Sequence, residues 1–250
     1  MRARNGRTKK DIDKPNDGLD KSSSSFVVNF GTFTASAQSA RLLERIGGEQ
    51  RLVQLCTGFY RKAFEDSHLA PFIGEMDADM HGARLALYIA QRMNPNNPLW
   101  SEDIAKRDST DVHSRAGAHS RAWHCPKRSP KSIGRRFKLD DCRVWMRLMM
   151  WSAREEELLN DEEFGPFFVR FIGHFIAVYE RSAQVFARES ARWSISTESI
   201  RAYEEGGRRM ADVVGIPYND AVNDLSAEEL HSDWPYEGAY DRVEGPNDFD

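Results

Sequence analysis

The sequence predicts an all-α fold with one folded domain. Between residues 37 and 195, apolar side chains recur every three or four positions, as they do along one face of an α-helix. Glycine and proline interrupt this pattern at Gly47-Gly48 and within residues 94–98 and 125–136. No segment alternates convincingly between apolar and polar residues, as a half-buried strand would. We therefore expect about six helices joined by loops.

The two ends of the chain differ in charge from the domain between them. Residues 1–36 carry seven basic and four acidic side chains, whereas residues 201–250 carry four basic and thirteen acidic ones. Such polar segments contain too little apolar surface to fold on their own. We expect three parts, namely a disordered polar tail over 1–36, the helical domain over 37–195, and an acidic, largely mobile extension over 196–250.

Composition argues against several classes of protein. No run of 18 apolar residues is present, and the first residues lack the apolar core of a secretory signal, so we expect no membrane association. Cys56, Cys125 and Cys142 are odd in number and have no CxxC spacing, which indicates reduced thiols and a cytoplasmic setting. No basic stripe is interleaved with aromatic residues, so nucleic acid is not an expected partner.

The helical pattern also predicts where each helix lies. The expected helices are a short one ending at Gly47-Gly48, one from Glu49 to about Asp66, one from about Asp77 to Met93, one around 112–123, one starting at Leu139-Asp140-Asp141, and a long one from near Gly165-Pro166 to Trp193. The helix that starts at Leu139 is hydrophobic on nearly every side, so we expect it in the centre of the domain.

Three histidines lie close together in the segment DVHSRAGAHSRAWH. On a helix, Val112, Ala116, His119 and Trp123 share one face, whereas His113 and His124 lie on the opposite one. His119 is therefore the histidine on the apolar face, beside small residues that leave room for a flat group. A neutral imidazole in such surroundings suits an axial metal ligand, although a histidine bonded within the core has the same pattern.

Other segments combine several spaced features. The run LLERIGGEQRLVQLCTGFYRKAFEDSHLAPF contains a Gly-Gly break, the pair Phe59-Tyr60 and a corner of the form D-x-x-L-x-P-F that begins at Asp66. HGARLALYIAQRM follows with Arg84-Leu85, and RVWMRLMMWSA contains Trp145. In this order, these features resemble the truncated, two-over-two haemoglobins, group II of that family most closely. The resemblance covers roughly residues 40–190 and implies a two-over-two helical sandwich around haem b.

The resemblance also implies roles for individual residues. Tyr60, beside Phe59, would direct its hydroxyl at a ligand of the haem iron, and His81 would lie at the entrance to the same pocket. Leu85 would close the pocket, and Trp145 would offer its indole N–H. The family has an aromatic residue that contacts haem at the position of Ile73, so this chain departs from the pattern there, and Phe72 is the residue that could compensate.

The proximal iron ligand has three candidates. The apolar helix face selects His119, with Trp123 beside it. The family often has histidine, a small residue and proline at this point, which selects His124 in the sequence HCP. A count along the family pattern without the extra residues of this region selects His113.

The implied function is binding of oxygen, and of nitric oxide, at the haem iron. One alternative is a haem enzyme, either a nitric oxide dioxygenase or peroxidase-like, which would need a separate reductase partner because the sequence shows no reductase domain. The other alternative is a haem-free helical scaffold whose acidic extension contacts a partner. No catalytic side chain is assigned in any of these hypotheses.

Overall fold

The fold is helical, which confirms the all-α class. The computed structural model describes residues 28–29, 32–33, 36–73, 77–94, 123–131, 133–177 and 179–230. A two-residue antiparallel pair, β1 (Val28–Asn29) and β2 (Thr32–Phe33), lies in the segment 1–36 that we expected to be disordered. Valine, threonine and phenylalanine favour extended pairing, and the sequence interpretation did not include this hairpin.

Two helices separated by a glycine pair begin the domain. α1 (Ala37–Arg45) starts after Ser36, whose side chain accepts a hydrogen bond from the Ser39 amide at 3.2 Å. Gly47 and Gly48 then adopt φ angles of 97° and 76°, which side chains disfavour, and the chain turns sharply into α2 (Glu49–Glu65). The predicted break between the two helices and the start of α2 at Glu49 are confirmed.

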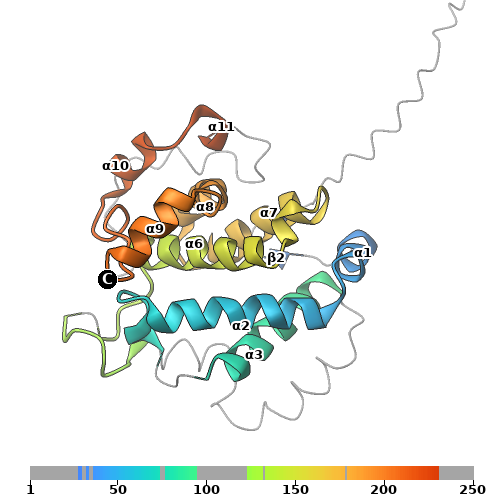
Figure 1. The fold of residues 1–250 in the computed structure, drawn as a ribbon, viewed down its shortest axis with the longest axis horizontal. Coiled ribbons are helices and arrows are strands. Elements are labelled where there is room, and N and C mark those ends of the chain that lie inside the picture. Colours follow the sequence, from blue (N-terminus) through green and yellow to red (C-terminus); the bar gives the residue numbers. More distant parts are fainter. Residues whose placement is uncertain are drawn as a thin grey trace, which may run out of the picture.

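A tight turn follows α2, and we call residues 66–73 the corner. It contains the 3-10 helix η1 (Ala70–Phe72) and leads towards α3 (Ala78–Met93). Asp77 caps α3 by accepting a hydrogen bond from the Met80 amide at 2.9 Å. α2 packs more extensively against α3 than against any other element, and Figure 1 shows α3 beneath α2.

α6 (Leu139–Glu155) is the central helix, as predicted. It contacts α2 on one side and α8 (Ala187–Trp193) on the other, and Figure 1 shows it running beside α2. Of its 17 residues, 12 are buried. Two of these are arginines, Arg143 and Arg147. The Arg147 guanidinium donates hydrogen bonds to buried Glu189 of α8 and, at 2.7 Å, to Asp212. The helix is therefore central although its inner faces are not purely apolar.

The long helix expected from Gly165 to Trp193 is wrong as a single element. The chain forms α7 (Phe164–Ala177), the 3-10 helix η3 (Arg181–Phe186) and then α8. The short 3-10 segment η2 (Leu158–Asn160) precedes them. The break has a local cause, because the Glu180 carboxylate accepts hydrogen bonds from the Ser182 amide at 3.0 Å and hydroxyl at 2.7 Å. This side chain caps a new turn instead of continuing α7.

The packed part of the chain continues beyond the expected boundary at residue 195. α9 (Thr197–Glu205), α10 (Tyr218–Asn223) and α11 (Ala227–Leu230) lie over α8 and the end of α6 (Figure 1). Buried apolar side chains anchor this segment, among them Tyr203, Met210 and Val213. Residues 196–230 therefore belong to the fold, in contrast to the mobile extension that their acidic composition predicted.

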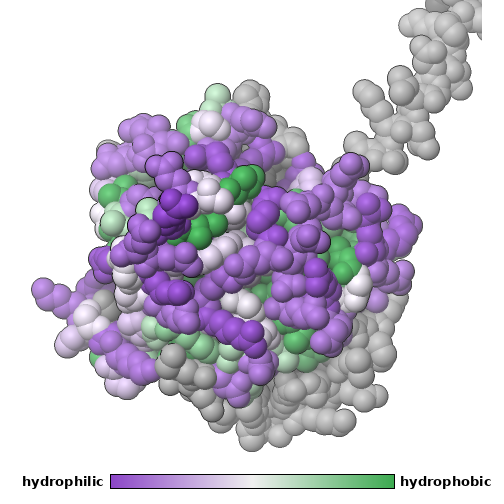
Figure 2. Space-filling view, in the orientation of Figure 1, coloured by the Kyte–Doolittle hydropathy of each residue, from purple (hydrophilic) through white to green (hydrophobic). Residues whose placement is uncertain are grey.

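The surface of the described residues is mainly polar. Figure 2 shows a predominantly hydrophilic face on which hydrophobic residues form small, separate areas. Ile133 and Ile195 are the exposed large apolar side chains of the described residues. None of the helices described here has the length and apolar character needed to cross a membrane.

Candidate functional site

A cavity of about 610 Å³ lies between α2, α3, the corner, α6 and the end of α7. Among its lining residues are eight that the sequence analysis singled out: Phe59, Tyr60, Phe72, Ile73, His81, Leu85, His124 and Trp145. They come from elements that are up to 86 positions apart in the sequence, from 59 to 145. The volume lies within the range of roughly 300–1,000 Å³ that is typical of small-molecule sites.

Tyr60 and His81 form the α2–α3 side of the cavity. Their ring centroids lie 5.0 Å apart, and the Phe64 ring lies 6.0 Å from that of His81. Burial raises the pKa of the Tyr60 hydroxyl well above its usual range. Tyr60 therefore remains a neutral hydroxyl, able to donate a hydrogen bond, at any physiological pH.

The close approach of α2 and α3 depends on Gly82, the residue after His81. A Cβ atom at Gly82 would lie 2.4 Å from the Thr57 Oγ1 and 2.7 Å from the Thr57 amide nitrogen. Only a residue without a side chain fits there. Gly82 thus allows the contact between the two helices that carry Tyr60 and His81.

Trp145 forms the α6 side of the cavity. It is the single residue between Asp141 and Ala153 that is not fully buried, because its ring faces the cavity. The ring packs against Phe59 at 4.9 Å and against Phe175 at 6.0 Å between centroids. Both Trp145 and Tyr60 line the cavity, and each side chain carries one hydrogen-bond donor, the indole N–H and the hydroxyl.

The corner contributes both Phe72 and Ile73 to the lining. Phe72 is 8% exposed and packs against Phe137 at 5.4 Å, and the Arg128 guanidinium lies 4.0 Å above its ring. Ile73 is half-buried beside it. The Phe72 ring therefore lies at this wall, one position before Ile73, where the resemblance implies an aromatic residue.

The loop after the histidine-rich segment forms another side of the cavity. His119 and His113 lie outside the described residues. His124 lines the cavity edge, but it is exposed, and its Nε2 lies 3.5 Å from the place of a Cβ atom on Gly134. Trp123 is not among the lining residues; its ring packs 5.8 Å from that of Phe137.

Several lining residues were not assigned to the site from sequence. They are Ala63, Leu69, Arg84, Cys125, Pro126, Phe137, Asp141, Cys142, Phe175, Ile176 and Tyr179. Phe175 and Tyr179 recur at helical spacing, which core packing explains equally well, so spacing alone did not identify them. The position of Cys125 directly after His124 was the available signal for that residue.

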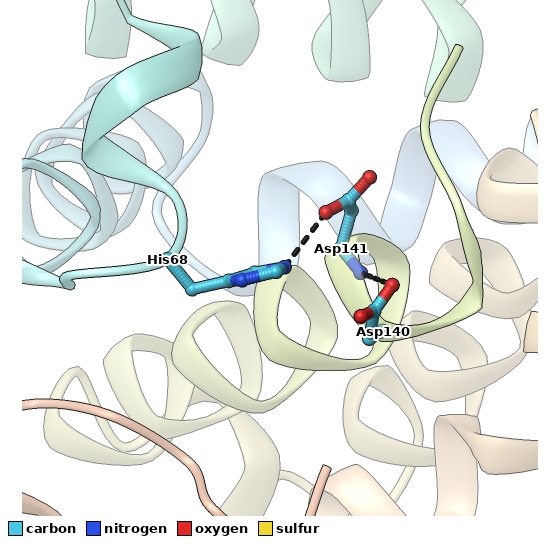
Figure 3. Close-up of side chains that lie close together, drawn as sticks. All are labelled: His68, Asp140 and Asp141. Carbon is cyan, nitrogen blue, oxygen red and sulfur yellow. Dashed lines mark hydrogen bonds and ion pairs between the residues drawn. The ribbon is translucent and has the colours of Figure 1, made fainter. Parts of the chain in front are cut away.

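A polar cluster lies where the corner meets the start of α6 (Figure 3). His68 Nε2 and Asp141 Oδ1 are 2.7 Å apart, and one ligand atom each of His68, Asp140 and Asp141 lies within 4.8 Å of the others. Both Asp141 oxygens have protein partners, since Oδ2 accepts a hydrogen bond from the Lys138 amide at 2.8 Å. This cluster therefore functions as a link between the corner and α6.

The cluster also determines the protonation of His68. Burial lowers the pKa of this imidazole, but the hydrogen bond and charge of Asp141, with the charges of Asp140 and Asp66, outweigh burial and raise it overall. The protonated form is thus favoured by the fold. Local sequence patterns do not reveal this pair, because its members are 73 positions apart in the chain.

No protein-family model, no curated protein and no solved structure matches this chain.

Proposed function

We propose that this chain is a globin of the truncated, two-over-two type that binds haem b in the cavity and, through the haem iron, oxygen and nitric oxide. One observation carries the proposal. Seven residues to which the resemblance assigns a place around haem come from four separate elements and line one cavity: Phe59, Tyr60, Phe72, Ile73, His81, Leu85 and Trp145. The pairing of α2 with α3 and the central place of α6 agree with the helix arrangement that this fold requires.

The lining fits a flat, mainly apolar group. Aromatic and aliphatic side chains supply most of the wall, and polar groups are few and converge from different elements. His124 and His81 are the described histidines that line the cavity, and His119 remains the candidate selected by its helix face. When bound, haem supplies an iron centre that coordinates diatomic gases.

The chain's own contribution is to place hydrogen-bond donors beside that centre. Tyr60 presents its hydroxyl and Trp145 its indole N–H as hydrogen-bond donors. The imidazole of His81 lies beside the Tyr60 ring and also lines the cavity. A hydrogen bond to a charged acceptor contributes about 1.5–3 kcal/mol, which corresponds to roughly tenfold to a hundredfold slower release of the gas. We therefore propose slow oxygen release, which suits sensing or nitric oxide chemistry better than oxygen delivery. Turnover of nitric oxide would require electrons from a separate reductase.

A haem-free helical scaffold is the second candidate, and the exposure of His124 favours it. A proximal ligand needs a dry, neutral imidazole, whereas this ring lies at the cavity edge against Gly134. If the scaffold is correct, the cavity exists but does not hold iron.

Absorption spectra of the purified chain with haemin test the proposal. We expect a sharp Soret band that shifts on reduction and again with carbon monoxide. His119→Ala should abolish stable haem retention, while His124→Ala and His113→Ala should retain it. A His174→Gln variant is the matched control, because His174 is buried in α7 and does not line the cavity. Broad absorption that carbon monoxide leaves unchanged would favour the scaffold instead.

A further inference from the structure

A tyrosine near the C-terminal end of the fold reaches the corner that forms one wall of the cavity. The Tyr203 hydroxyl in α9 donates a hydrogen bond to Asp66 Oδ2 at 3.0 Å. Asp66 is fully buried, and Tyr203 is 3% exposed, with its ring edge-on to Trp151 and Trp193. This contact joins residues that are 137 positions apart.

The same carboxylate organises the corner. Asp66 Oδ1 accepts hydrogen bonds from the amides of His68 at 2.9 Å and Leu69 at 2.7 Å. Leu69, and Phe72 after it, line the cavity. One oxygen of Asp66 thus fixes the turn that presents the wall, while the other oxygen is held by Tyr203.

Two further contacts follow Tyr203 along the chain. The Arg208 carbonyl accepts hydrogen bonds from the Ser67 amide at 3.0 Å and hydroxyl at 3.2 Å, and the Arg208 guanidinium pairs with Glu65. Arg208 adopts a φ of 54°, a left-handed conformation that is uncommon without glycine and persists only where surrounding contacts hold it. The Gly215 amide then donates to Asp140 Oδ2, at the start of α6, at 3.3 Å.

We propose that residues 197–215 form a strap that holds the corner in place, and that Tyr203 is a positioning residue for the cavity, acting through Asp66. Displacement of the corner would break the bonds to Tyr203 and Arg208 together and would open the cavity at Leu69 and Phe72. This inference goes beyond the proposed function, because it concerns the wall of the cavity and holds for any ligand.

The three cysteines allow a test that needs no haem. Cys125 and Cys142 line the cavity and are buried, whereas Cys56 is buried in α2 and does not line it. The rate of modification of each thiol in the full chain is measured by mass spectrometry with a small alkylating reagent. Tyr203→Phe removes only the hydroxyl and retains the ring packed between the two tryptophans.

Arg192→Gln is the matched control within the same C-terminal region. The Arg192 Nε donates to Glu229 Oε1 at 2.5 Å, which ties α11 to α8 without any contact to the corner. Urea unfolding of both variants gives the global stability, so that modification rates are compared at equal loss of stability.

We expect Tyr203→Phe to accelerate modification of Cys125 and Cys142 by about tenfold or more, the factor that corresponds to loss of a hydrogen bond to a carboxylate. Arg192→Gln should leave both rates within about twofold of the wild type once global stability is matched. If Tyr203→Phe accelerates the cavity thiols no more than Arg192→Gln does, the strap proposal is overturned.

A second variant keeps the test decisive if Tyr203→Phe has additional effects. Asp66→Asn weakens the same hydrogen bond from the acceptor side. The double variant that combines Tyr203→Phe with Asp66→Asn should therefore modify the cavity thiols little faster than the faster of the two single variants. Full additivity of the two substitutions would show that Tyr203 does not act through Asp66. Absence of haemin binding would leave these results unchanged and would count only against the proposed function.

Discussion

Substitution of two glycines by alanine should change stability in opposite directions. Gly58 lies within α2, and a Cβ atom added there meets no atom within 4 Å. Gly58→Ala should therefore stabilise the fold by about 0.5–1 kcal/mol, because alanine loses less backbone entropy in a helix. Gly82 lies within α3, where an added Cβ atom would meet Thr57.

The structure gives the size of the clash at Gly82. The added Cβ atom would lie 2.8 Å from the Thr57 Cα, whereas unstrained carbon contacts begin near about 3.5 Å, so the two helices must separate locally by about 0.7 Å. Overpacking of this kind costs about 1–3 kcal/mol. Both variants gain the same helix propensity, so the difference between Gly58→Ala and Gly82→Ala isolates the steric cost.

Urea denaturation of both variants measures this difference, provided that the slopes of the transitions agree. We expect Gly82→Ala to be less stable than Gly58→Ala by about 1–3 kcal/mol. Separation of α2 and α3 would also move His81 away from Tyr60, which near-ultraviolet circular dichroism detects as a change in aromatic signal. Equal stability of the two variants would refute the close helix approach on which this side of the cavity depends.

Three further predictions concern other parts of the molecule. Tyr60→Phe should speed oxygen release from the haem-loaded chain about tenfold or more, measured by stopped-flow displacement with carbon monoxide. Tyr88→Phe is the control, because Tyr88 does not line the cavity, and it should leave the release rate unchanged. Equal release rates in the two variants would show that Tyr60 does not contact the bound ligand. His68 has a pKa raised above its unfolded value of about 6.5, so its contribution to stability is fully present below that pH and is lost as the pH rises through the folded pKa. His68→Gln should remove this part of the pH dependence in urea unfolding, and an unchanged profile would contradict the assignment. Glu189→Gln should cost about 3–5 kcal/mol in the same assay, because it leaves buried Arg147 without its buried carboxylate; a loss below about 1 kcal/mol would show that the pair contributes little.

Local patterns predicted much of the helical domain. The Gly47-Gly48 break is a short-range signal that separates α1 from α2, and the bounds expected near Glu49, Asp66, Asp77 and Met93 lie within about one residue of those of α2 and α3. The apolar character of α6 on nearly every side likewise predicted its central place. The cavity residues were found through spaced features that resemble one family, since Tyr60 or Trp145 alone could equally be an ordinary core residue.

Long-range contacts explain what the sequence did not predict. Apolar residues after position 195 are sparse and surrounded by acidic ones, so composition predicted mobility, but Tyr203 finds its partner Asp66 at the other end of the fold. The break after α7 depends on one side-chain cap at Glu180, a local contribution of about 1 kcal/mol that aromatic periodicity does not reveal. In both cases the decisive contact involves polar atoms, which apolar patterns do not report.

Stoichiometric haemin titration of the wild type and a cavity-blocked variant tests the central claim most directly. Leu85→Trp places a large ring into the cavity from α3, at a half-buried position. We expect a Soret change that saturates at one haem per wild-type chain and is strongly weakened in Leu85→Trp, with both chains folded as judged by circular dichroism. Binding that does not saturate at this ratio, or that Leu85→Trp leaves unchanged, would contradict the claim that this cavity holds haem.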